Sequence, residues 1–228
     1  MTELVTFIRD AINSGDIATV YQIIHSLYSN KNKDDAEYDR VELKIRVMTR
    51  KYISYGIPDL GAIELIASVI GFDTAVEVGA GNGFWAALVK HRLEKIGCGG
   101  TIFATDNFSL PKEYDNYTEV ENLEAVEAVK KYSMAKVLIL IWPPRDDPMA
   151  FNALSEFKGD YVIYIGEPQG YSTGDNNFHQ LLSAEWEEAK GYFTEDGNFH
   201  RCLPDEWNEA NSYFTEDVNS HQLLSYEL

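Results

Sequence analysis

The stretch that most constrains this chain is residues 74–85, T-A-V-E-V-G-A-G-N-G-F-W. It opens with a short apolar and β-branched run that suits a buried strand of a parallel sheet. Three glycines then alternate at Gly79, Gly81 and Gly83, and an apolar, helix-like segment follows at 84–93. A strand, a glycine turn and a helix bring backbone N–H groups and a helix N-terminus up against a ligand. Glycine is needed there because a Cβ would block both the turn and the approach of the ligand.

Two common nucleotide-binding turns do not fit this stretch. The dinucleotide fingerprint needs a glycine at its sixth position, where this chain has Phe84. The phosphate-binding P-loop needs Gly-Lys-Ser/Thr after four spacer residues, and the sequence contains no such run. The turn therefore serves another class of ligand, or it is a glycine-rich turn of an unrelated α/β protein.

An acidic residue, Glu77, stands two positions before the first glycine. The resulting E-x-G-x-G-x-G run resembles the first motif of the class I S-adenosylmethionine-dependent methyltransferases. The resemblance implies that the loop wraps the methionine and ribose part of the cofactor and that Glu77 helps to orient its amino group. The loop residues that it assigns to the cofactor are Gly79, Ala80, Gly81 and Gly83. A ligand with a sulfonium and an ammonium group suits an acidic turn better than a pyrophosphate does.

A second strand-like run, residues 101–106, ends in the carboxylate of Asp106. An acidic residue at the end of the second strand, some 20–30 residues beyond the glycines, is placed to accept hydrogen bonds from ribose hydroxyls. We therefore expect Asp106 to bind the ribose and Asn107 to lie near the adenine. The alternative for Asp106 is an aspartate that caps a helix or closes a turn.

A fully apolar run at 137–141 leads into Trp142-Pro143-Pro144-Arg145. This segment resembles the fourth methyltransferase motif, which lies beside the transferable methyl group. In amino-directed members the motif has Asp or Asn, two prolines and an aromatic residue. Trp142 here replaces the polar residue and Arg145 the aromatic one, which counts against amino-methylation of a base. We expect Trp142, Pro143 and Pro144 to shape the substrate position, with Trp142 also at the cofactor; a stiff strand exit is the alternative.

Strand-like and helix-like segments alternate along the middle of the chain. Strands are expected at 101–106, 137–141 and 160–165, and helices at 119–132 and 148–157. This alternation predicts an α/β protein with a doubly wound, mostly parallel sheet, the Rossmann-like class I methyltransferase fold. Ligands of such sheets bind beyond the carboxyl ends of the strands. Four residues at predicted strand ends should therefore line one crevice: Glu77, Asp106, Trp142 and Glu167. Glu167 is a candidate to position the substrate or act as a base, or it is a surface residue.

The likeness extends over roughly residues 52–175. Its other motifs are an I-P turn at 57–58, D-P-M at 147–149, Y-I-G-E at 164–167 and T-G-D at 173–175. In this order they resemble a little-characterised group of methyltransferase-like proteins. The resemblance implies a fold and a cofactor, S-adenosylmethionine, but no substrate.

The chain divides into three segments on this reading: an N-terminal helical extension at 1–55, a methyltransferase-like core at 56–176 and an acidic C-terminal segment at 177–228. The extension carries apolar residues at helical spacing, first at Leu4, Val5, Ile8, Ala11 and Ile12. It either packs on the sheet as part of a lid or selects the substrate. The sequence leaves both possibilities open.

The C-terminal segment is a tandem repeat with a period of 21 residues. Residues 177–197 recur at 198–218, and a truncated third copy closes the chain at 219–228. The methyltransferase fold ends in an antiparallel strand pair, and the third copy is a candidate for its last strand. The same residues would then form a helix in an early copy and a strand in the last copy, and the sequence does not decide whether this is so. The repeat aligns His179, His200 and His221, but copying alone explains that alignment, so no metal site is expected.

Charge and composition indicate which classes of substrate and partner to expect. The net charge is −18, and from Asp175 onward 12 acidic and 2 basic residues give a balance of −10. Such a chain repels nucleic acid, so a small-molecule or protein substrate is expected, and the acidic repeat is a possible docking surface for a protein partner. No membrane-spanning run or secretion signal is found, and the two cysteines have no metal spacing. A cytoplasmic location is the expectation.

The sequence thus predicts a transferase that moves a methyl group by in-line positioning next to Trp-Pro-Pro. Its substrate and general base are not identified by any motif. The alternative is a non-catalytic cofactor-binding or protein-interaction protein that keeps the fold. A nicotinamide oxidoreductase is disfavoured by Phe84 in the glycine loop.

Overall fold

The computed structural model describes most of the core of the chain. It describes residues 2–16, 60–109, 115–166 and 172–185, and shorter pieces at 18–20, 22–23, 26, 47, 49–50, 52–56, 58, 187–188, 192–193, 199–200 and 222–227. Much of the predicted N-terminal helical extension at 1–55 therefore lies outside the described residues, as does most of the second repeat copy.

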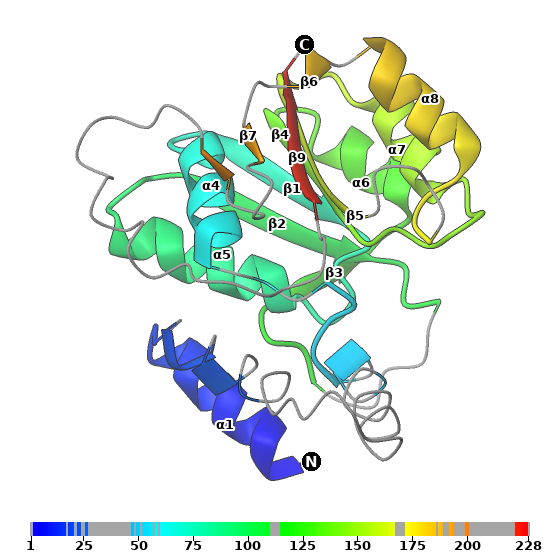
Figure 1. Cartoon of the computed structure of the whole chain (residues 1–228). Coiled ribbons are helices and arrows are strands. Elements are labelled where there is room, and N and C mark those ends of the chain that lie inside the picture. The colour runs from blue at the N-terminus through cyan, green and yellow to red at the C-terminus, as the bar shows by residue number, and fades with distance from the viewer. Residues whose placement is uncertain are drawn as a thin grey trace.

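A twisted sheet forms the centre of the molecule (Figure 1). Within the described residues, seven strands lie in the order β3-β2-β1-β4-β5-β9-β6. Their bounds are β1 Thr74–Val78, β2 Thr101–Asp106, β3 Val120–Asn122, β4 Val137–Ile141, β5 Tyr161–Gly166, β6 Glu187–Glu188 and β9 Gln222–Glu227. Strands β1 to β5 are parallel, whereas β9 runs antiparallel to both β5 and β6. The parallel order 3-2-1-4-5 confirms the predicted Rossmann-like α/β fold and is that of a methyltransferase core.

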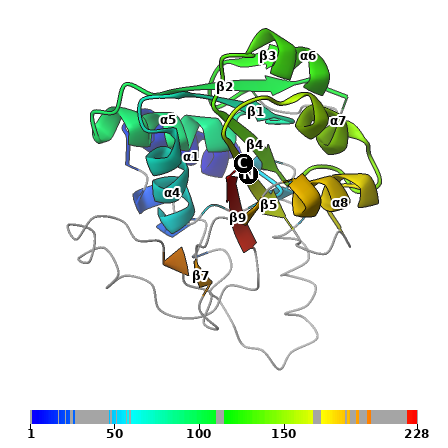
Figure 2. The same cartoon turned by 90° about the horizontal axis from the view of Figure 1, so that it is seen from above.

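Helices cover both faces of this sheet (Figure 2). One face carries α1 Thr2–Asn13, α4 Leu60–Ile70 and α5 Phe84–Lys95. The other carries α6 Ala125–Lys131, α7 Met149–Glu156 and α8 Asn176–Glu185. Side chains alternate between the faces along each strand, so Val137 and Ile139 pack on the first group while Leu138 and Leu140 pack on the second. Burial on both faces is why the central strand β4 has a continuous apolar sequence.

The predicted helix at 119–132 is wrong at its beginning. Val120–Asn122 forms β3, which pairs with the end of β2 from Ala104 to Asp106. The helix α6 begins only at Ala125, because Glu124 and Glu127 form a capping box there. The charged sequence favours a helix throughout, but the free backbone edge of β2 recruits the first residues as a strand.

The first and third repeat copies take different secondary structures. The first copy begins within α8, and β9 lies in the third copy, where it pairs with β5 over six residues. Two short strands, β7 Tyr192–Phe193 and β8 Phe199–His200, pair antiparallel with each other. No helix in the part of the chain that the structure describes has the length and apolarity needed to cross a membrane.

Candidate functional site

The glycine loop lies beyond the carboxyl end of β1, and its three glycines all have left-handed backbone angles. Their φ values are 73° at Gly79, 58° at Gly81 and 72° at Gly83, which side chains with a Cβ rarely adopt. Their surroundings differ. A Cβ on Gly79 would lie 3.0 Å from Met149 Cε, and one on Gly83 would lie 2.7 Å from Val120 Cγ2. A Cβ on Gly81 would meet no described atom within 4 Å, so Gly81 is the glycine that faces open space.

Asp106 holds the loop in place. Its Oδ2 accepts a hydrogen bond from the Gly81 N–H at 2.8 Å, and its Oδ1 accepts one from the Phe108 N–H at 2.7 Å. The Thr105 carbonyl next to it accepts the Ala80 N–H at 2.9 Å. The end of β2 is therefore bonded directly to the glycine loop. A carboxylate has lone pairs for further donors, so these bonds leave Asp106 able to accept a ligand hydroxyl.

Glu77 is a buried carboxyl group on the α5 side of β1. Only 2% of its surface is exposed, and it accepts a hydrogen bond from the backbone N–H of Ala86 in the first turn of α5. Its Oε2 is buried and has no hydrogen-bond partner among the described residues. Burial raises the pKa of Glu77 to about 8, and the negative charge of Asp106 adds to this rise. The two acidic residues thus lie close enough to interact. A cation between them would offset both the burial of the Glu77 carboxylate and its repulsion by Asp106.

Asn82, within the loop, has a role that the sequence analysis missed. Its Oδ1 accepts the Phe84 N–H at 3.2 Å and so satisfies one of the free N–H groups at the start of α5. Its backbone carbonyl accepts the Tyr117 N–H at 2.8 Å. An Asn just before a helix was a signal that the sequence contained, because Asn is a preferred capping residue.

Asn107, the predicted adenine neighbour, follows Asp106 at the end of β2 and is exposed. Its Oδ1 accepts the Ser109 N–H at 3.0 Å, and its Nδ2 donates to Glu124 Oε2 at 3.3 Å. The amide is therefore held at the surface by its own loop and by the start of α6. A role at the adenine stays a prediction.

The Trp-Pro-Pro segment follows β4 directly. Trp142 is half-buried with a left-handed φ of 51°, and its backbone N–H donates to the Ile165 carbonyl of β5 at 2.7 Å. Pro143 is buried and its carbonyl accepts the Gly174 N–H at 3.1 Å, whereas Pro144 is exposed. The W-P-P and T-G-D motifs thus meet at the carboxyl edge of the sheet.

The D-P-M motif also reaches this edge. Asp147 Oδ1 accepts the Met149 N–H at 2.8 Å at the start of α7, and the Met149 side chain packs against Gly79. Met149 was not among the predicted site residues. The reason is that its contact with the glycine loop joins residues far apart in the sequence.

Two further sequence predictions concern Glu167 and the matched histidines. Glu167 lies outside the described residues, so its role stays a prediction. His179 is half-buried, and a nitrogen of its ring lies 2.8 Å from the Thr173 carbonyl. Among the described residues, no three His, Cys, Asp or Glu side chains group in a way that could hold a metal ion.

Comparison with known proteins adds a distant likeness. No family model matches the chain, and no curated protein matches it. A solved structure of human N-acetylserotonin methyltransferase in complex with SAM is similar with a TM-score of 0.40 and 16% identity. The similarity covers 73% of this chain and 51% of that one, so this chain matches about half the length of that enzyme. At this distance no residue's role transfers from one protein to the other.

Proposed function

We propose that this protein is an S-adenosylmethionine-dependent methyltransferase that acts on a small molecule or a protein. The observation that carries the proposal is the buried, unpartnered oxygen of Glu77 beside Asp106, next to a glycine loop that is open at Gly81. A buried carboxylate is costly unless a positive group pairs with it. S-adenosylmethionine carries two positive groups, an ammonium and a sulfonium, so its charge suits this site.

The same charges disfavour nucleotide phosphates. A pyrophosphate would bring negative charge toward the carboxylate of Asp106, which faces the loop, and would offer no cation to the buried Glu77. The loop N–H of Gly81, which could otherwise bind a phosphate oxygen, already donates to Asp106. NAD and ATP are therefore poor ligands for this loop.

Each residue of the site has a distinct role in this proposal. Gly81 lets the backbone approach the cofactor closely, Asp106 accepts the ribose hydroxyls, and Glu77 orients the amino group. Trp142 and Pro143 fix the wall beside the methyl group, because the turn they form is tied to β5 and to Gly174. The cofactor supplies an already activated methyl group, so the protein needs mainly to align the acceptor and exclude water.

A ligand panel tests the proposal. Thermal unfolding is measured with S-adenosylmethionine, S-adenosylhomocysteine, NAD and ATP at equal concentrations. A ligand at 100 times its Kd stabilises the folded state by about 2.7 kcal/mol, so the two methionine-derived ligands should raise Tm. Stabilisation by NAD or ATP, without any by the other two, would overturn the proposal.

Glu77→Gln gives a sharper test, because glutamine keeps an acceptor for the Ala86 N–H but carries no charge. We expect S-adenosylhomocysteine to bind about tenfold more weakly or worse, since a charged hydrogen bond is lost. The ligand-free variant should nevertheless be more stable than the wild type at pH 8, by roughly 4 kcal/mol at most.

The pH dependence follows from the direction of the shift. The folded protein keeps the Glu77 proton up to about pH 8, whereas the unfolded chain releases it near the ordinary glutamate pKa of 4.5. Wild-type stability therefore falls through this pH window, and the Glu77→Gln variant lacks this fall. Urea unfolding at pH 5 and pH 8 measures it. The exposed Glu94→Gln on α5 is the control, and a fall of equal size in both variants would contradict a buried Glu77.

A second candidate is a donor-binding protein without transferase activity, and the observation that favours it is Trp142. Methyl transfer to an amine calls for a polar group after β4, and this chain has an indole and two prolines there. Incubation with a methyl-labelled donor and fractionated cell extract separates the two candidates. Label in a small-molecule or protein fraction supports the enzyme, whereas tight binding without transfer supports the second candidate.

A further inference from the structure

A short segment upstream of the core, residues 52–56, lies against the glycine loop; we call it the strap. The Tyr52 carbonyl accepts hydrogen bonds from Tyr117 Oη at 3.3 Å and from Asn82 Nδ2 at 3.5 Å. The Gly56 carbonyl accepts one from Trp85 Nε1 at 3.0 Å. Both ends of the strap are thus bonded to side chains of the loop, of α5 or of the segment that enters β3.

The strap also fits closely over the carboxyl edge of the sheet. A Cβ on Gly56 would lie 3.2 Å from Ile141 Cγ2, at the end of β4, and 3.8 Å from Ile165 Cγ2, near the end of β5. Ile53 is 3% exposed and belongs to the core on the α5 side. This edge is where ligands of a parallel sheet bind, so the strap lies at the mouth of the proposed site.

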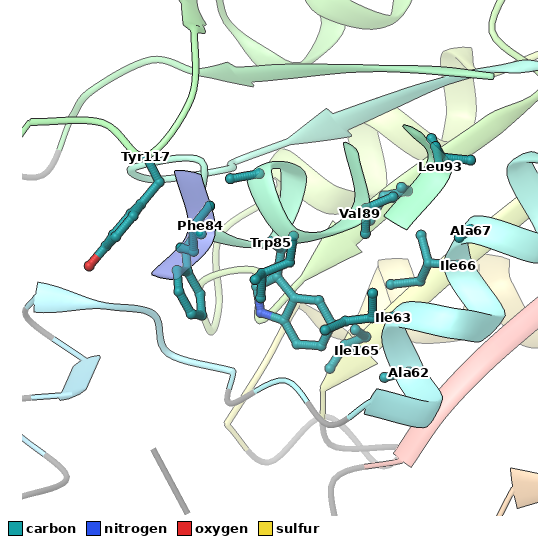
Figure 3. Packing of buried hydrophobic residues seen from close by; sticks show 14 of the residues in the cluster. Ala62, Ile63, Ile66, Ala67, Phe84, Trp85, Val89, Leu93, Tyr117 and Ile165 are labelled. Atoms are coloured by element: carbon teal, nitrogen blue, oxygen red, sulfur yellow. The ribbon is translucent and has the colours of Figure 1, made fainter. Parts of the chain in front are cut away.

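The groups that hold the strap are themselves parts of the site. Asn82 is a residue of the glycine loop, and Trp85 is in the first turn of α5 (Figure 3). Tyr117 packs its ring against Phe84 with the centroids 5.0 Å apart, and its backbone donates to Asn82. A change in the position or rigidity of the loop is therefore passed directly to the strap.

The outer side of the strap is much less buried. Tyr55 is 49% exposed, and the guanidinium of Arg50 lies 5.9 Å from its ring centroid. The amides of Ile53 and Ser54 both donate to the Thr49 carbonyl, so the strap continues from the end of a helical turn. One face is thus bonded to the site and the other faces outward, so the strap can loosen locally without the sheet unfolding.

We propose that the strap closes the methyl-donor site, and that donor binding and strap docking on Asn82, Trp85 and Tyr117 stabilise each other. This inference rests on the proposed function, because it takes the ligand of the glycine loop to be the methyl donor. Coupling of this kind is reciprocal. A methyl donor that rigidifies the loop stabilises the docked strap, and a change that weakens strap docking lowers the affinity for the donor.

Two matched hydroxyl deletions test the coupling. Tyr117→Phe removes the bond to the Tyr52 carbonyl and keeps the ring contacts, whereas Tyr55→Phe removes a hydroxyl from the outward-facing side of the strap. Asn82→Asp is a second variant, since it keeps the acceptor for the Phe84 N–H and removes the donor to Tyr52. Hydrogen exchange of strap and loop amides is followed by mass spectrometry, with and without S-adenosylhomocysteine, and the affinity is measured by calorimetry.

We expect S-adenosylhomocysteine to slow exchange in the glycine loop and also in the strap. Tyr117→Phe and Asn82→Asp should each speed hydrogen exchange of the strap amides. Each should also lower the affinity for S-adenosylhomocysteine by about two- to tenfold, the range for one lost hydrogen bond. Tyr55→Phe should change neither. Protection of the loop without the strap, or equal behaviour of the two Phe variants, overturns the inference and leaves the proposed function standing. If S-adenosylhomocysteine protects neither the loop nor the strap from exchange, both the inference and the proposed function are overturned.

Discussion

Two regions of this protein have almost the same sequence and different secondary structures. Residues 180–185, Q-L-L-S-A-E, lie in the helix α8, whereas Q-L-L-S-Y-E forms the strand β9 between β5 and β6. Five of the six residues are identical. Local propensity therefore does not choose the structure of this sequence, and the surroundings of each copy must do so.

The first copy is a helix because its beginning is anchored. Asp175 Oδ1 accepts the Phe178 N–H at 2.7 Å, which caps the helix. Phe178 is fully buried, with its ring centroid 5.1 Å from that of Tyr164 in β5. Leu182, one turn further along, is buried in the same core. The helix thus has both a cap and an apolar face that packs on the sheet.

The third copy keeps the capping residue but loses the anchor. Asp217 corresponds in sequence to Asp175, whereas Ser220 stands where the first copy has Phe178. What the third copy gains is a partner backbone, because β9 pairs with β5 from Gly166↔Gln222 to Tyr161↔Glu227. A buried aromatic residue and an available strand edge, rather than the shared residues, separate the two outcomes.

The second copy has Asp196 and Phe199 at the positions of Asp175 and Phe178, but a proline interrupts it. Pro204 occupies the position of Ser183 in α8 and Ser225 in β9. Proline has no N–H for a helix or for a strand bonded on both sides, so this copy suits neither position. Four predictions sharpen this comparison, from the largest expected effect to the smallest.

Phe178→Ser gives the first copy the residue of the third. We expect a loss of about 4 kcal/mol in the free energy of unfolding, because a buried ring is removed and a hydroxyl is left in its place. Urea unfolding measures the loss, with the exposed Phe7→Ser on α1 as the control. A loss no larger than that of the control would show that Phe178 does not anchor α8.

Ser225→Pro gives the third copy the residue of the second. Ser225 lies opposite Ile163 in the middle of β9, so we expect a loss of about 3 kcal/mol or more. The reverse change, Pro204→Ser, should alter stability by less than about 0.5 kcal/mol. Denaturant unfolding of both variants checks the pair, and a harmless Ser225→Pro would contradict the pairing of β9 with β5.

Asp175→Ala removes the cap of α8 without touching its apolar face. We expect a loss of about 1 kcal/mol, the usual cost of an N-cap. Asp175→Asn should recover most of it, because asparagine also caps. Thermal unfolding followed by circular dichroism compares the two. Equal losses in both variants would assign the effect to charge rather than to capping.

Deletion of residues 198–218 removes one complete period. We expect the free energy of unfolding to change by less than about 0.5 kcal/mol, because a shorter connection costs slightly less to close and both α8 and β9 remain. Affinity for S-adenosylhomocysteine should also be unchanged. A variant without a cooperative unfolding transition would show that the second copy is part of the fold.

Much of the core was predictable from local sequence. The strands β1, β4 and β5 are short, mostly apolar runs, and such runs are typical of strands buried on both faces of a parallel sheet. The order of the strand-like runs placed Glu77 and Asp106 at the same edge of the sheet, and the charge of Asp106 adds to the raised pKa of Glu77, whereas a shared crevice stays a prediction. Each of these predictions depended on neighbours in the sequence or on the general geometry of parallel sheets.

The predictions that failed or were missing depend on contacts between distant residues. Residues 120–122 form a strand only because the edge of β2 lies beside them. Met149 contacts Gly79, and Asn82 donates to Tyr52, although the partners are far apart in the sequence and no residue pattern between them predicts the contact. A single sequence does not encode such pairs in any local pattern.

By itself the sequence determined the glycine turn, the alternation of strands and helices and the acidic character of the site, since these follow from residue type and short-range spacing. The tertiary structure alone decided which copy of Q-L-L-S became helix and which became strand. The physical reason is that the two states of this tetrapeptide differ little in local free energy. A buried ring at one position and an unpaired strand edge at the other are each large enough to tip the balance.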